Sequence, residues 1–206
     1  MHGNTVLKKN TGLGAAAIIL ITLVGLAVLA ALFGIGQYNG FVSLDTTLQQ
    51  AASNVDVQLK RRADLIPNLV QTVKGYAKHE KDVFTNIAMA RSQLLSARTG
   101  ENPGKAAAAN ANFSSALGRL LALAENYPNL KADKQFIQLQ DELAGTENRI
   151  TYARTQYNEI VRNYNTAIRV FPSNIIASIT GFQSKQSFEA AEADKIVPKV
   201  SFEEKP

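Results

Sequence analysis

The chain has 206 residues, of which 46% are hydrophobic, with a formal charge of +5 and no cysteine. The length suffices for one folded domain and a membrane anchor, and the lack of cysteine excludes disulfides and thiolate metal sites. With two histidines in the sequence, an imidazole metal site has little support, and the basic residues form no patch of the kind that binds nucleic acid. We therefore expect no metal, cofactor or nucleic acid, and the sequence identifies no small-molecule substrate.

An uncharged apolar run covers residues 13–36, LGAAAIILITLVGLAVLAALFGIG. A helix of this length reaches about 36 Å, enough to span a hydrocarbon core about 30 Å thick with some tilt. A cleaved signal peptide is the alternative, but its apolar region is usually only about 7 to 15 residues long. The run predicts an uncleaved transmembrane helix that follows a short basic tail, residues 1–12.

The basic residues around this span predict its orientation. Lys8 and Lys9 precede it, and the next basic residue is Lys60. The positive-inside rule then favours a cytoplasmic N-terminus and an extracytoplasmic domain. We expect a single-pass membrane protein.

After the span the sequence predicts helix almost throughout, because strand-like alternation is absent. Apolar residues recur in steps of three and four, which predicts one helix face from about Tyr38 to Ala97. Pro67 interrupts this stripe, and Asp64 is a suitable N-cap three positions earlier. We therefore expect a kink or a helix restart at this point.

Two further helices are expected, the first at about 103–126 with Asn102 as its N-cap. The second, at about 133–171, carries an apolar residue every seven positions: Phe136, Leu143, Ile150, Tyr157, Tyr164 and Phe171. The positions three residues later hold Leu139, Thr146, Ala153, Ile160 and Ala167, as at a coiled-coil seam. Helices joined by short loops pack antiparallel, so the fold class is all-α, with an up-down helical bundle over residues 37–182.

The C-terminal part is divided into a short apolar piece and a polar tail. Residues 173–182, SNIIASITGF, predict a short helix or turn that caps the bundle. Contact of this piece with the membrane surface is the alternative. Residues 183–206 are expected to form an extended polar tail.

Charged and amide side chains on or beside the predicted apolar faces form the set of candidate residues. They are Arg62, Asp64, Glu80, Glu147, Arg149, Arg154, Asn158 and Asn165, together with Pro67. Polar residues at a helix seam fix its register, and a buried charge needs a partner, so we interpret these residues as structural. The alternative is a carboxylate active site made of Glu80 and Glu147, which would need a pocket and a raised carboxylate pKa.

Several segments support a family resemblance. They are YN at 38, RRADLIPNLVQTVKGYAKHE at 61, AR at 90, ELAGTENRITYARTQYNEIVRNYNTAIRVFPSN at 142, and FEAAEA with VPKVSF near the end. Across nearly the whole chain this sequence resembles the LemA family. The resemblance implies a bacterial membrane protein with one N-terminal span and an antiparallel helical bundle. It implies no settled activity, cofactor or catalytic residue.

Three functional hypotheses follow. The favoured one is a non-enzymatic helical scaffold, tethered to the bacterial cell (inner) membrane, that binds other envelope proteins or itself. The second is a membrane-shaping protein that assembles laterally and places residues 173–182 at the lipid surface. The third is a hydrolase centred on Glu80 and Glu147.

Overall fold

The structure is a computed structural model that describes residues 11–188, with side chains described from residue 14 onward. The described elements are α1 (Thr11–Tyr76), α2 (Lys81–Ser96), α3 (Pro103–Leu123), a 3-10 turn (Ala124–Asn126), α4 (Pro128–Lys131), α5 (Lys134–Ala167) and α6 (Ser173–Thr180). This confirms the all-α class. Two compact units divide the described chain, one with residues 11–43 and 167–183, the other with residues 44–166 and 184–188.

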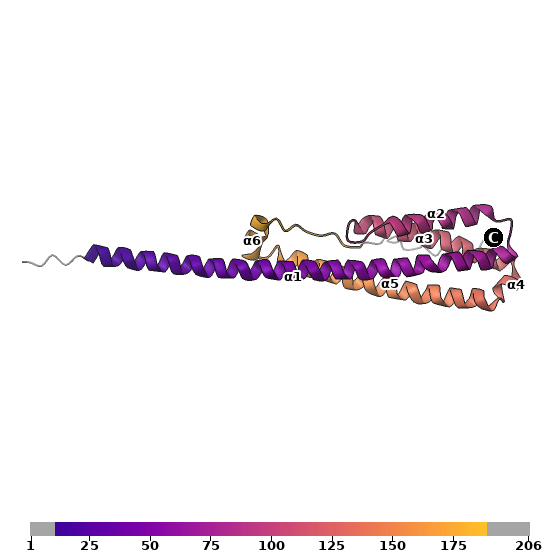
Figure 1. Ribbon diagram of the computed structural model, residues 1–206, viewed down its shortest axis with the longest axis horizontal. Helices are drawn as coiled ribbons and strands as arrows, with labels where there is room; N and C mark the ends of the chain where they lie inside the picture. The colour runs from indigo at the N-terminus through magenta and orange to yellow at the C-terminus, as the bar shows by residue number, and fades with distance from the viewer. Residues whose placement is uncertain (1–10, 189–206) are drawn as a thin grey trace, which may run out of the picture. The chain divides into compact units, whose positions relative to one another are not determined.

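The larger unit is a bundle of α2, α3, α5 and the second half of α1, in which successive long helices run in opposite directions (Figure 1). All four helices contribute fully buried side chains to one core, among them Val55, Ile66, Leu69, Ile87, Phe113, Leu120, Phe136 and Ile150. Each helix therefore presents one apolar face to its neighbours, as the residue spacing predicts.

The first long helix differs from the prediction of one helix from Tyr38 to Ala97. The helix starts earlier than predicted, because α1 is continuous from Thr11 through residue 38. It also ends earlier, at Tyr76 rather than at Ala97. The amide of Lys81 bonds to the carbonyl of His79 in a tight turn, and α2 then begins. The sequence signal for this turn is the polar run KHEKD at 78–82, which puts Glu80 where the apolar stripe would continue.

The starts of α3 and α5 are fixed by side-chain caps. The amide of Lys105 donates to Asn102 Oδ1 at 2.8 Å, which confirms the predicted cap of α3. Asp133 caps α5 in the same way, accepting from the amide of Phe136 at 2.9 Å, and it also accepts from the Tyr76 hydroxyl at 2.9 Å. These hydrogen bonds to its charged form lower the pKa of Asp133.

The seam predicted along the last long helix is confirmed except at its end. The buried seam residues of α5 are Phe136, Leu139, Leu143, Thr146, Ile150, Tyr157 and Tyr164, with Ala153 and Ile160 partly buried against the same core. The Thr146 hydroxyl is satisfied by donating to the carbonyl of Leu143 at 2.8 Å. Phe171 was wrongly placed in the seam: it is 80% exposed, because α5 ends at Ala167.

The smaller unit contains the first part of α1 and the short helix α6. The apolar stretch of α1 has a mean hydropathy of 2.9 and is not buried in the protein, so this helix is long and apolar enough to cross a membrane. Gly181 ends α6 at φ +81°, a left-handed conformation that glycine adopts without steric cost.

Candidate functional site

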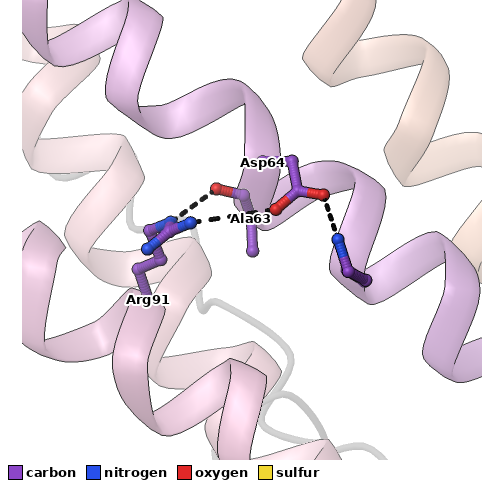
Figure 2. A network of polar contacts seen from close by, with 4 residues as sticks. Ala63, Asp64 and Arg91 are labelled. Carbon is purple, nitrogen blue, oxygen red and sulfur yellow. Dashed lines mark hydrogen bonds and ion pairs between the residues drawn. The ribbon is translucent and has the colours of Figure 1, made fainter.

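Pro67 lies inside α1, which continues through it, so the predicted helix restart at this point is wrong. A proline in a helix has no N–H to offer the carbonyl four residues earlier, which here belongs to Ala63. Arg91 of α2 supplies the missing donor: its Nε bonds to the Ala63 carbonyl oxygen at 2.9 Å (Figure 2). The freed carbonyl is therefore satisfied from a neighbouring helix, and α1 continues.

Asp64 is also not the N-cap that the sequence suggested, because no helix begins there. Its Oδ1 lies 3.8 Å from a terminal nitrogen of Arg91, and its Oδ2 pairs with Lys60 one turn earlier (Figure 2). The carboxylate thus lies beside the arginine that reaches Ala63. Pro67, Asp64 and Arg91 form one structural unit that joins α1 to α2.

A second polar cluster surrounds Arg62, which is 5% exposed in the core of the bundle. Its Nη1 donates to Asn110 Oδ1 and Ser114 Oγ, both at 3.0 Å, and lies 2.7 Å from Glu147 Oε2. The guanidinium carbon also stands 5.1 Å from the centre of the Phe113 ring, within the range of a cation–π contact. One side chain of α1 therefore holds α3 and α5 together.

The positive charge of Arg62 is buried, and the negative charge of Glu147 partly offsets the cost of that burial. Burial lowers the pKa of Arg62, while the charge of Glu147 opposes that shift. The Glu147 side chain is 41% exposed, so the pair reaches from the core to the surface. Arginine stays protonated even so, and the interpretation of both residues as structural partners fits this arrangement.

Glu80, the other half of the alternative carboxylate pair, takes no part in this cluster. It occupies the N-cap position of α2 and makes no side-chain capping hydrogen bond. Glu147 lies on α5 beside Arg62, so the two carboxylates occupy different environments. Across residues 14–188, no group of three or more His, Asp or Glu side chains is placed to hold a metal ion.

A third cluster consists of two asparagines on α5 that bind the backbone of residues 184–188. The Asn158 side chain accepts from the Phe188 amide at 2.7 Å and donates to the Phe188 carbonyl at 3.0 Å. Asn165 binds Lys185 in the same two-bond manner, with both distances 2.8 Å. Each asparagine side chain thus bonds both the N–H and the C=O of one residue, as the backbone of a neighbouring β-strand does. We call this the asparagine clamp.

The spacing of the clamp follows from helix and strand geometry. Asn158 and Asn165 are seven residues apart, which is about 10.5 Å along a helix. Lys185 and Phe188 are three residues apart, which is about 10 Å in an extended chain. Two turns of α5 therefore match three residues of an extended segment running in the opposite direction.

Side-chain contacts reinforce the clamp. Phe188 is 2% exposed and belongs to the main core, with Arg154 4.6 Å above its ring. The Tyr157 hydroxyl donates to the Gln186 carbonyl at 3.1 Å, and burial raises the pKa of this hydroxyl. Lys185 pairs with Asp45 of α1 at 3.0 Å. The segment 184–188 therefore packs against the bundle. It is the first part of the extended polar tail predicted for residues 183–206, of which residues 189–206 lie outside the described residues.

We expect Asn158→Ala to release residues 184–188 locally while the rest of the bundle stays folded. The variant loses two hydrogen bonds worth about 1 kcal/mol each, so the protection of the Lys185 and Phe188 amides should fall by roughly 30-fold. Hydrogen exchange followed by mass spectrometry measures this. Asn163→Ala, at an exposed position of the same helix, is the control. Equal exchange in both variants would show that the clamp holds nothing in place.

Arg149 lies outside these clusters and borders an open groove between α1 and α5. The groove, of about 410 Å³, is lined by Asn54, Val57, Gln58, Asn148, Arg149, Tyr152, Ala153 and Gln156. Val57 is 59% exposed and Tyr152 66% exposed. In this groove apolar side chains remain open beside polar ones.

Sequence reasoning missed Arg91, Asn110 and Ser114 as partners of the candidate residues. Asn110 is buried, and Ser114 partly so, in a helix rich in alanine, where an amide and a hydroxyl could have been recognised as partners for a buried charge. Arg91 has no such signal, because only the fold places it opposite residue 63.

Taken together, an antiparallel helical bundle whose first helix also carries an apolar stretch of membrane-spanning length defines a membrane-associated all-α protein. The model of the LemA family matches residues 51–202, and the chain belongs to this family. The resemblance seen in the sequence is thereby confirmed.

Named relatives include magnetosome proteins. The chain is 29% identical to magnetosome protein MamQ 1 of Paramagnetospirillum magneticum, over 74% of this chain and 65% of that protein. It is 28% identical to magnetosome protein MamQ of Magnetospirillum gryphiswaldense, over 80% of this chain and 70% of the relative. It is 25% identical to protein LemA of Metamycoplasma hominis, over 79% and 73%. The chain thus spans about 65% of the length of MamQ 1.

Proposed function

We propose that this protein is a membrane-anchored, non-catalytic scaffold of the bacterial cell envelope that binds other envelope proteins or itself. The observation that carries the proposal is the continuity of α1 from Thr11 to Tyr76. The same helix supplies the apolar stretch and the central buried face of the bundle. In this proposal the first part of α1 is the anchor, and its second part belongs to the folded module. The charge distribution around the span supports a cytoplasmic N-terminus.

The arrangement of the buried polar groups supports a non-catalytic role. Arg62 forms an ion pair with Glu147 and hydrogen bonds to α3, and Arg91 satisfies a backbone carbonyl. A catalytic carboxylate is normally recognised by a shifted pKa in a pocket, with a free face toward a substrate. Glu147 instead faces a buried cation, and Glu80 lies at a helix end away from it.

The groove that contains Val57 and Tyr152 is the surface we assign to partner proteins. Aromatic and aliphatic side chains with arginine at the rim are typical of protein interfaces, and exposed apolar groups gain most from being covered. The relatives described as magnetosome proteins support membership in a membrane-associated assembly.

The experiment uses the absence of cysteine in the natural chain, which makes every introduced thiol unique. Tyr152→Cys in the groove is compared with Ser115→Cys at an exposed position of α3. After reaction with a thiol-directed photocrosslinker in intact membranes, we expect discrete products from Tyr152→Cys alone. Mass spectrometry identifies the partner, and Val57→Asp should abolish the product. Equal or absent products at both positions, with a monomer in detergent, would contradict the proposal.

A further inference from the structure

We propose that residues 170–179 form a second membrane contact, an apolar foot that lies in the lipid interface beside the point where α1 leaves the bilayer. We define the foot by the outward-facing side chains Val170, Phe171, Ile175 and Ile179. Its ligand is the lipid surface itself. The inference goes beyond the scaffold role, because a scaffold needs only its span for attachment.

The first step is the position of α6 against α1. Ser173 Oγ bonds to Gln37 Oε1 at 2.9 Å, and a Cβ at Gly34 would lie 3.6 Å from the Ile176 side chain. Phe182 packs edge-on against Tyr38 and Phe41, with ring centres 5.8 and 5.3 Å apart. These α1 positions span the end of the apolar run 13–36 and the first turn after it. The short helix is therefore tied to the end of the membrane-length stretch.

The second step is the face that α6 leaves uncovered. Ser173, which binds Gln37 of α1, and Ala177 are buried, at 7% and 3% exposed. Phe171 is 80% exposed, Ile179 77% and Ile175 49%. Residues 175 and 179 are four apart and share one side of the helix. Phe171 lies in the turn before α6 and is the most exposed of the three. These three large apolar side chains are left uncovered by the described chain.

The third step is the chemistry of the surroundings, which selects lipid as the occupant. Between residues 167 and 183 the single charged residue is Arg169, and there is no acidic residue. On α1 the first acidic residue is Asp45. A carboxylate near the bilayer would oppose insertion, whereas an arginine beside exposed phenylalanine suits the anionic headgroup region. The half-exposed Tyr38 matches the aromatic belt found at membrane interfaces.

Continuity with the span distinguishes lipid from a second protein. The side chains of α1 from residue 14 to residue 33 are almost all exposed and apolar, as lipid contact requires. The foot is held against the next residues of the same helix, so lipid that surrounds the span also reaches the foot. Lipid alone can therefore cover the apolar side chains of the foot, and no partner protein is needed for this.

The absence of tryptophan from the natural chain provides the test, because one introduced tryptophan is then a unique probe. Phe171→Trp and Ile179→Trp report on the foot, and Ser115→Trp, at an exposed position of α3, reports on water-exposed bundle surface. The full-length variants are reconstituted into vesicles of phosphatidylcholine and phosphatidylglycerol. A matched set of vesicles carries bromine near the upper end of the acyl chains.

We expect the emission of both foot variants to shift to shorter wavelength and to be largely quenched in the brominated vesicles. Ser115→Trp should show neither effect, and Leu23→Trp, within the span, serves as the quenched reference. A short-wavelength emission at 171 and 179 without quenching would show that protein covers the foot and would overturn the proposal. Emission typical of water at both positions would overturn it equally. Circular dichroism of each variant checks that the helices are retained.

Discussion

Replacing Glu147 by alanine is expected to lower the free energy of unfolding by about 3 kcal/mol, because it leaves the buried Arg62 charge without its counter-ion. Arg62 is 5% exposed, and Asn110 and Ser114 offer only neutral acceptors. Urea denaturation of the full chain in detergent micelles, followed by far-ultraviolet circular dichroism, measures the change. Glu80→Ala is the control, with an expected change below about 0.5 kcal/mol for a partly exposed, uncapped position.

A double variant separates the charge effect from the loss of packing. Adding Arg62→Met to Glu147→Ala removes the unpaired charge and keeps an apolar stem of similar length. The double variant should therefore be more stable than Glu147→Ala alone, although Asn110 loses its partner. A further loss of stability in the double variant would show that Arg62 does not need its carboxylate. If Glu80→Ala abolished function without destabilisation, the hydrolase hypothesis would gain over the structural one.

Replacing Arg91 by leucine is expected to cost about 1.5 kcal/mol in the natural sequence and much less when Pro67 is also replaced by alanine. In the natural chain the Ala63 carbonyl depends on Arg91, because Pro67 has no N–H. Pro67→Ala restores that N–H, so the helix can satisfy the carbonyl without the arginine. The same denaturation experiment yields a coupling energy of about 1 kcal/mol from the four variants.

Arg119→Leu, an exposed arginine on α3, controls for the loss of a surface charge and should change stability by less than about 0.5 kcal/mol in either background. The contact of Arg91 with Asp64 is 3.8 Å long and partly exposed, so its loss contributes little to the change in stability of Arg91→Leu. An equal cost of Arg91→Leu with and without Pro67 would refute the link between the proline and the arginine.

Pro67 shows why local rules misplaced a helix boundary. A proline with an aspartate three residues earlier is a valid start signal when nothing else supplies the missing hydrogen bond. Arg91 is 28 residues away in sequence and reaches Ala63 only because α2 folds back along α1. Phe171 shows the opposite error, a helix predicted to continue past its true end. The seven-residue repeat extends to Phe171 in the sequence, but α5 ends at Ala167.

The sequence by itself determined the helical class, the apolar stretch of membrane-spanning length, the cap at Asn102 and the buried seam from Phe136 to Tyr164. These features depend on the chemistry and spacing of residues within a few turns of one another. Tertiary structure alone decided which partner each polar residue takes: Asn110 and Glu147 for Arg62, Ala63 for Arg91, and the backbone of residues 185 and 188 for the two asparagines. A hydrogen bond requires two atoms within about 3 Å, and periodicity along one helix carries no information about which atom a neighbouring helix brings there.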